Sequence, residues 1–163
     1  MTWTPAENTL LAQAIADTST TKKHTLGTRI RCKDPTYGVG EFIYLEGVAS
    51  TAANSWVTFS ADDYSTALLA ANAIGPVAVA MSANVANQYG WYQIYGKAVG
   101  KALASYADNG LVYATATAGS IDDAAVLGDR VKNALGASAV DTPSTGLAEF
   151  EIQYPFMDDG SAA

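Results

Sequence analysis

The chain of 163 residues contains one cysteine and one histidine, and this scarcity excludes several kinds of chemistry. A single cysteine, Cys32, cannot form an intrachain disulfide, which fits folding in a reducing cytoplasm, and we predict that it is a small buried hydrophobic residue. A structural zinc site needs three or four Cys or His ligands, more than this chain offers. His24 is the one imidazole base, and it lies in a polar stretch that does not indicate the fixed geometry of a catalytic base.

The carboxylates also lack a catalytic pattern. They include three adjacent pairs, each in a predicted loop: Asp62-Asp63, Asp122-Asp123 and Asp158-Asp159. Neighbouring strand residues point to opposite faces, so such pairs rarely act as an acid and a base, and none matches a calcium-loop motif. The lone Gly38-Val39-Gly40 fits a turn better than a phosphate cradle. We therefore predict a protein that is not an enzyme, with no catalytic residues, no cofactor and no metal.

Charge is scarce and unevenly distributed. Charged residues make up 15% of the chain, against roughly 25% in an average soluble domain. The net charge is −7, but residues 1–33 carry five basic and two acidic groups, which gives +3, and residues 34–163 carry four basic and fourteen acidic groups, which gives −10. A basic leader on an acidic body predicts docking on an acidic surface, and the acidic body argues against nucleic acid as a partner.

Long apolar runs are missing as well. The longest nearly uncharged stretch, residues 64–96, is interrupted by Pro76 and by several amide side chains, so it does not predict a membrane span. The first fifteen residues lack the basic start of a signal peptide. We expect neither a membrane partner nor a secreted product.

The first 33 residues read as an N-terminal arm. Thr4, Pro5 and Glu7 form the capping pattern that starts a helix, which predicts a short amphipathic helix over about residues 5–16. A polar linker follows. Residues 25–33 then alternate apolar and basic side chains, which predicts an extended segment with a basic outer face.

Residues 34–157 read as one β domain, and residues 158–163 as a tail. Short runs rich in β-branched and aromatic residues alternate with Gly, Asn, Asp and Pro, which predicts a mainly β fold, a compact antiparallel sandwich or barrel-like domain. Residues 62–73 are ambiguous and allow one or two helical turns. The predicted strands are 41–46, 56–59, 76–81, 91–95, 99–103, 111–115, 131–135 and 150–154.

The most aromatic of these runs contains Trp91, Tyr92 and Tyr95. Core packing is one interpretation, because both faces of this strand can be covered. A contact between subunits is the second, since Trp and Tyr are enriched at interfaces. A sugar-binding platform is the third.

Several sequence segments of the chain resemble proteins encoded among the virion-structure genes of tailed bacteriophages, in particular the capsid decoration (cement) proteins. The likeness runs from about residue 26 to 159 and rests on whole segments rather than on a catalytic signature. These segments are Leu26-Gly27-Thr28, Asp34-Pro35-Thr36-Tyr37-Gly38-Val39-Gly40-Glu41-Phe42-Ile43-Tyr44-Leu45, Gly90-Trp91-Tyr92-Gln93-Ile94-Tyr95-Gly96, Ala114-Thr115-Ala116-Thr117-Ala118-Gly119 and Gly146-Leu147-Ala148-Glu149-Phe150-Glu151-Ile152.

The resemblance implies a β domain on the outer surface of a capsid, synthesised in the bacterial host cytoplasm and assembled as a homotrimer at local three-fold positions. The major capsid protein would be its partner, and the N-terminal arm would add a strand to the shell. The candidate capsid-binding residues are Leu26, Arg29, Ile30, Arg31 and Lys33, and the candidate intersubunit residues are Trp91, Tyr92 and Tyr95.

Two other classes of function stay open. One is another virion module, such as a head fibre base or a tail or adhesion component with a carbohydrate-binding face, for which an exposed aromatic patch is expected. The other is a small hydrolase that uses carboxylates of perturbed pKa in a concave site.

Overall fold

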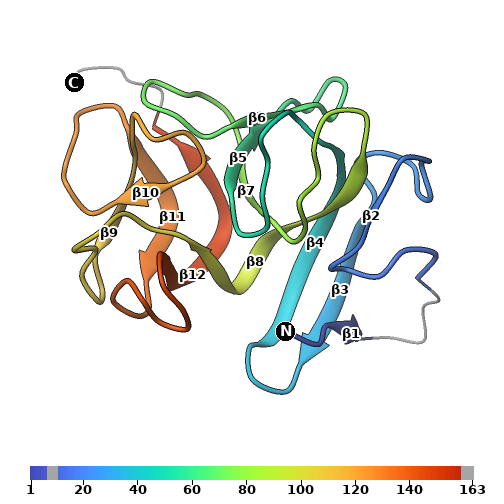
Figure 1. Cartoon of the computed structure of the whole chain (residues 1–163), viewed down its shortest axis with the longest axis horizontal. Coiled ribbons are helices and arrows are strands. Elements are labelled where there is room, and N and C mark those ends of the chain that lie inside the picture. Colours follow the sequence, from blue (N-terminus) through green and yellow to red (C-terminus); the bar gives the residue numbers. More distant parts are fainter. Residues whose placement is uncertain (7–10, 159–163) are drawn as a thin grey trace.

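A computed structural model describes residues 1–6 and 11–158, and in these ranges the chain is built from β-strands without a helix (Figure 1). All pairings between named strands are antiparallel, which confirms the mainly β, antiparallel prediction. The strands are β1 (Thr4–Pro5), β2 (Thr18–Ser19), β3 (Arg29–Asp34), β4 (Gly38–Glu46), β5 (Trp56–Phe59), β6 (Thr66–Leu68), β7 (Val77–Ala80), β8 (Tyr89–Lys101), β9 (Leu111–Ala114), β10 (Ile121–Asp122), β11 (Arg130–Gly136) and β12 (Leu147–Met157).

Neither of the predicted helical segments is found in the described part of the chain. Within the predicted helix 5–16, Pro5 belongs to β1, which pairs with β3, and residues 11–16 form bends and turns; residues 7–10 lie outside the described residues. A helix of about twelve residues is marginal in water, and here pairing with β3 and burial of Ile15 on the sheet compete with it. In the ambiguous segment 62–73, β6 forms instead and pairs with β5.

The long strand β8 joins two halves of the molecule. Residues 89–95 of this strand pair with β4, and residues 95–101 pair with β12. The runs predicted at 91–95 and 99–103 are therefore parts of one element, except for the last two residues of the second run. Figure 1 shows β8 passing from the half that holds β3 and β4 to the half that holds β9 to β12.

The change of partner falls at Gly96. Its φ of 98° is a conformation that side-chain-bearing residues rarely adopt, and a Cβ atom there would lie 2.5 Å from the carbonyl oxygen of Val39 in β4. The buried side chain of Gln93 spans the same point, because its Nε2 donates to the carbonyl oxygens of Tyr95 and Lys97, each at 3.1 Å. Glycine therefore allows the close passage of β8 over β4, and Gln93 fixes it.

Both faces of the β4–β8 pair are buried. Phe42, Tyr44 and Trp91 face a cluster that the N-terminal residues cover, whereas Ile43 and Tyr92 face a second cluster formed with β5 and β7. This pattern confirms the expectation that both faces of the aromatic strand can be covered.

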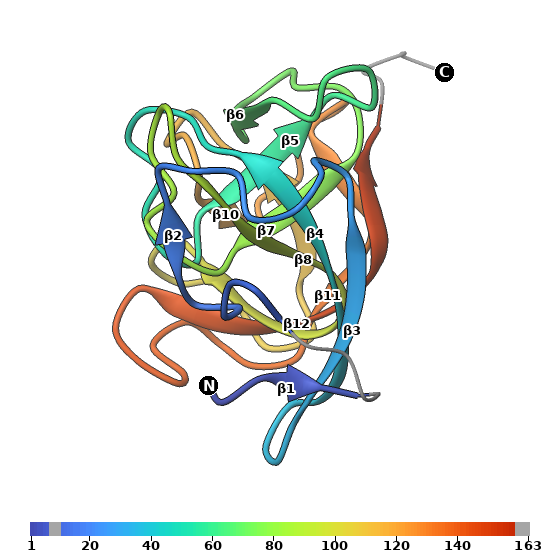
Figure 2. The same ribbon diagram turned by 90° about the vertical axis from the view of Figure 1, so that its right-hand side faces the viewer.

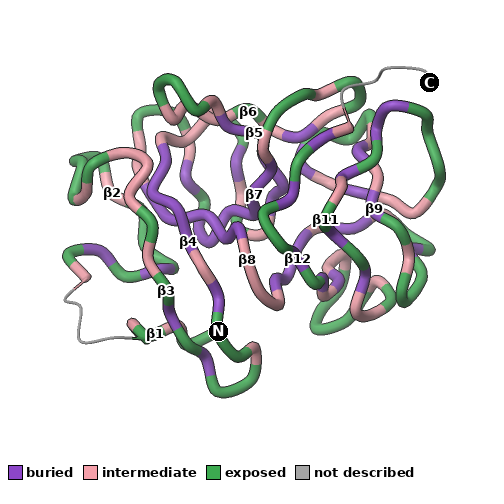
Figure 3. Tube along the Cα trace, turned by 180° about the vertical axis from the view of Figure 1, so that it is seen from behind, coloured by how far each residue is buried: buried purple, intermediate pink, exposed green. Residues whose placement is uncertain are grey.

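The paired strands β5 and β7 lie between two cores, and this position explains why every residue of both strands is buried. Val57 and Ala78 belong to the cluster shared with β4, whereas Trp56 and Val79 belong to the larger cluster shared with β9 to β12. The molecule is thus layered along its long axis, compatible with a β-sandwich, and the buried residues gather in its middle (Figures 1 and 3).

We expect Gly96→Ala to lower the free energy of unfolding by about 3 kcal/mol or more, because it adds a backbone clash to a strained φ. Gly38→Ala is the matched control: its φ is 75°, but a Cβ there meets no atom within 4 Å. The control should lose only about 1 to 2 kcal/mol. Urea denaturation of the two variants measures both values, and equal losses would show that the close passage at Gly96 has no energetic role.

Candidate partner-binding surface

Strand β3 carries three exposed basic side chains. Arg29, Arg31 and Lys33 are exposed, whereas Ile30 is half-buried and Cys32 and Asp34 are buried. This is the alternation expected of a strand with one covered face, and it confirms the predicted basic outer face.

The two apolar residues that were predicted to contact the partner are less exposed than the three basic ones. Leu26 and Ile30 are half-buried and pack against the cluster that contains Phe42 and Trp91. They hold β3 and its preceding turn on the sheet, so the outer face is left to the basic residues.

Arg31 is part of a hydrogen-bonded group that ties β3 to β12. Its Nε lies 3.4 Å from Oε2 of Glu41 on β4, and the hydroxyl of Tyr154 on β12 donates to the same oxygen at 2.8 Å. Hydrogen bonds to Tyr154 and Glu41 raise the pKa of Arg31 above its usual range, and the Glu41 carboxylate raises the pKa of Tyr154. The group orients both side chains on the surface.

The segment expected to be an arm packs on the body. The buried side chain of Gln13 accepts a hydrogen bond from the Tyr44 hydroxyl at 2.7 Å and donates to the carbonyl of Tyr89 at 2.9 Å, while Trp91 Nε1 donates to the Gln13 carbonyl at 3.0 Å. The chain between β2 and β3 crosses in front of β4 (Figure 2). In the described ranges this segment packs on the β domain, with Gln13 and Ile15 buried and most of its other residues exposed or half-buried.

Pairing within the chain also changes the expected mode of binding. Residues 29–34 pair with β4 along their whole length, and β1 pairs with Cys32 and Lys33 on the opposite edge. Residues 32 and 33 are therefore engaged on both edges and cannot pair with a partner's strand, whereas no described strand pairs with residues 29 and 30 on the edge away from β4. The exposed basic side chains are available along the whole of β3.

His24 is held between aromatic rings instead of lying in a loose linker. Its ring centroid is 4.9 Å from that of Trp91 and 5.2 Å from that of Tyr44, and its buried Nε2 has no hydrogen-bond partner. Burial lowers the pKa of His24 from its usual value. The neutral ring therefore acts as packing between the N-terminal segment and the sheet.

We expect the stability of the chain to fall as the pH decreases below about 6.5, the unfolded pKa of histidine. Because the folded pKa of His24 is lowered, the unfolded chain binds more protons in this window, and acid favours unfolding. Urea denaturation at several pH values should show this loss in the parent chain and a smaller loss in His24→Phe, which keeps an aromatic ring. Parallel pH profiles of the two proteins would contradict this role of His24.

The candidate intersubunit residues divide between core and surface. Trp91 and Tyr92 are fully buried within one copy of the chain, so neither presents a surface to a second copy, and core packing is the correct interpretation for both. Tyr95 is half-buried, and its ring lies 5.5 Å from the ring of Tyr154.

The remaining reactive groups form no recognisable centre. Cys32 is fully buried, as predicted, and burial raises the pKa of its thiol to about 11. Among residues 1–6 and 11–158, no three His, Cys, Asp or Glu side chains gather as metal ligands. The same ranges contain no helix of sufficient length and apolar character to cross a membrane.

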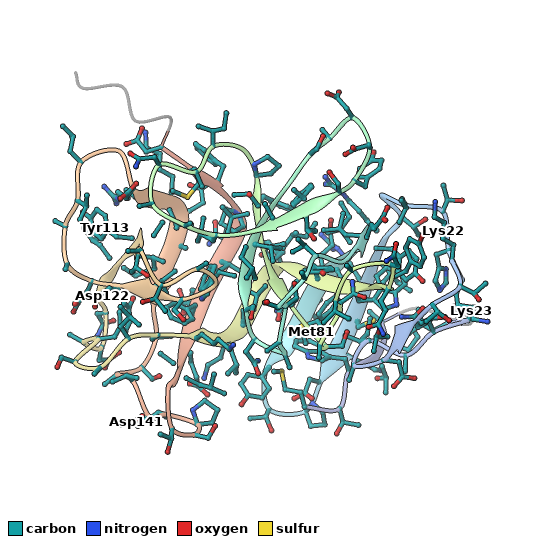
Figure 4. The ribbon with its side chains drawn as sticks, turned by 45° about the horizontal axis from the view of Figure 1, so that its top comes forward. Lys22, Lys23, Met81, Tyr113, Asp122 and Asp141 are labelled. Carbon is teal, nitrogen blue, oxygen red and sulfur yellow. The ribbon has the colours of Figure 1, made fainter. Side chains whose placement is uncertain are left out.

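Some of the charged side chains lie at opposite ends of the molecule. Lys22 and Lys23 lie at the end that also holds β3, whereas Asp122 and Asp141 lie in the opposite half (Figure 4). Acidic residues also lie beside the basic ones, such as Asp34 in β3 and Glu41 in β4, so the separation of charge is partial.

Two exposed aromatic residues were not identified from the sequence. Tyr154 and Phe156 are 43% and 42% exposed, although Phe150 and Ile152 earlier in β12 are buried. Strict alternation would place Tyr154 inward. Its φ of 52° and a shift of register against β11 interrupt the alternation, so that Tyr154 faces outward instead. Pro155 is the only local signal of this break.

No protein-family model, curated protein or solved structure matches the chain.

Proposed function

We propose that this chain is a structural virion protein that binds the outer surface of a phage capsid and stabilises the shell as a cement or decoration protein. The observation that supports it most is the basic face of β3, held rigidly at one end of an otherwise acidic molecule. The quoted resemblance to virion-structure proteins supplies the kind of partner, the major capsid protein.

The docking mode follows from the geometry of that face. Arg29 and Lys33 project from a strand that pairs with β4 along its length and with β1 at Cys32 and Lys33, so its backbone loses little freedom when they meet a partner. Exposed ion pairs contribute only about 0.2 to 1 kcal/mol each. A single copy would therefore bind weakly to an acidic patch on the capsid.

A homotrimer would overcome this weakness. Linking three weak sites makes the second and third contacts intramolecular and raises the overall affinity without new chemistry. Preferential binding to the assembled shell then stabilises it against dissociation by mass action. Of the aromatic candidates for the subunit contact, Tyr95 keeps exposed surface.

A carbohydrate-binding virion module, such as a fibre base or an adhesion component, is the second candidate. The exposed rings of Tyr154 and Phe156 favour it, because an exposed aromatic patch is the feature expected of that class.

The copy number per particle distinguishes the two functions. Quantitative mass spectrometry of purified virions should give a ratio near one to the major capsid protein if the chain is cement, because such a protein covers the whole shell. A few copies per particle would instead assign it to a fibre or tail, and its absence from the virion would refute both.

We expect Lys33→Glu to reduce binding to purified shells by roughly three- to tenfold at low salt, because it replaces attraction by repulsion. Arg130→Glu is the control: it makes the same change of net charge on an exposed residue of β11, in the opposite half. Sedimentation of shells with each labelled variant measures the difference. Equal loss in both variants would mean that net charge, rather than the β3 face, governs docking.

A further inference from the structure

A small groove opens beside the basic face of β3. Its volume is about 160 Å³, and it extends from β3 to the C-terminal part of β12 across β5, β7 and β8. The residues that define it are Arg29, Phe59, Pro76, Ile94, Tyr154 and Phe156. Five of these six are apolar or aromatic, and Arg29 is the one charged side chain in the wall.

The groove has a buried floor and an aromatic rim. Ile94 and Phe59 are 2% and 9% exposed, whereas Tyr154 and Phe156 at the rim are more than two-fifths exposed. Apolar rings around a depression are typical of protein contact sites, where they exclude water from a central anchor. The volume of the groove limits what it can bind. Pockets for small-molecule ligands usually measure about 300 to 1,000 Å³, so this smaller groove has room for about one large side chain.

The rim of the groove is held in place by contacts within the chain. Tyr154 has a positive φ of 52°, which is strained for a bulky residue, and such strain is often found at functional sites. Its hydroxyl donates to Glu41, and its ring packs against Tyr95. A side chain held in this way loses little freedom on binding.

Arg29 supplies a cation without a carboxylate partner among the described residues. The ion pairs in those ranges involve Arg31, Lys97 and Lys132 instead. Guanidinium groups bind carboxylates through two parallel hydrogen bonds, and an apolar setting strengthens such contacts.

We propose that this groove binds an extended segment of a partner protein in which a large apolar side chain is followed by a carboxylate. The apolar side chain fills the space between Ile94 and Phe156, and the carboxylate pairs with Arg29. This inference names the partner chemistry at the same end of the molecule, so it rests on the proposed docking function.

A saccharide fits the groove less well. Sugar recognition needs several polar groups that converge on hydroxyls, whereas Arg29 is the one polar group of the lining besides the Tyr154 hydroxyl, and Glu41 already engages that hydroxyl. The chemistry of the groove matches one apolar group and one anion.

The minimal probe of this chemistry is 3-phenylpropionate, with 3-phenylpropanamide as its neutral counterpart. We expect the carboxylate to bind the purified chain about tenfold more tightly than the amide, since only the carboxylate pairs with Arg29. Titration followed by NMR of the isoleucine methyl groups should shift Ile94, which lies in the groove, and leave Ile121, which is buried in the separate cluster of the other half, unchanged.

Three variants make the test specific. Arg29→Gln should abolish the preference for the carboxylate, and Arg130→Gln, on the far half, should preserve it. Phe156→Ala should weaken both probes to a similar extent, because it removes apolar contact and no charge. Phe156 is exposed, so its truncation should leave the fold intact, which the remaining methyl resonances report.

Equal affinity for the two probes, or shifts that fall outside the groove, would overturn the proposal. Binding of glucuronate in place of phenylpropionate would also overturn it and reassign the groove to a saccharide. These results are independent of the shell: failure of the chain to occupy capsids would refute the proposed function while probe binding persists, and absence of probe binding would refute the groove while capsid occupancy persists.

Discussion

The bend of β8 at Gly96 is the constraint on which the rest of the molecule depends. One strand pairs with β4 before this point and with β12 after it, so both halves of the sheet are anchored to a single backbone. A side chain at residue 96 would meet the carbonyl of Val39, and the amide of Gln93 bridges the carbonyls on either side. Because a backbone clash cannot relax as a flexible side chain can, this crossing sets how the two halves meet.

The paired strands β5 and β7 extend the sheet beside β8. Alternate residues enter different clusters, with Ala78 on one side and Val79 on the other, so neither face of this strand pair meets water. Small residues allow the layers to approach closely, and they also explain why the chain can hold a large core with so few charges. The low charge content therefore reflects a layered interior as well as any surface covered by partners.

The same crossing positions the proposed docking surface. Glu41 of β4 lies between Arg31 of β3 and Tyr154 of β12, and the hydrogen bonds among them join strands from the two ends of the sequence. The groove lies next to this group and shares Tyr154 with it. Under the proposed function, the basic strand and the apolar groove beside it would make weak contacts that are repeated over a protein shell.

The sequence by itself determined the features that depend on neighbouring residues: the β class, most strand positions, the outward direction of Arg29, Arg31 and Lys33, and the burial of Cys32. Alternation along a strand is local, so it can be read from the chain. Only the tertiary structure decided the conformation at the predicted helix start, because Thr4 and Pro5 pair with β3 as a short strand. It also placed Trp91 inside and Tyr154 outside, because the first depends on what covers each face of the sheet and the second on a register shift between β11 and β12. Such long-range pairings leave almost no trace in local sequence.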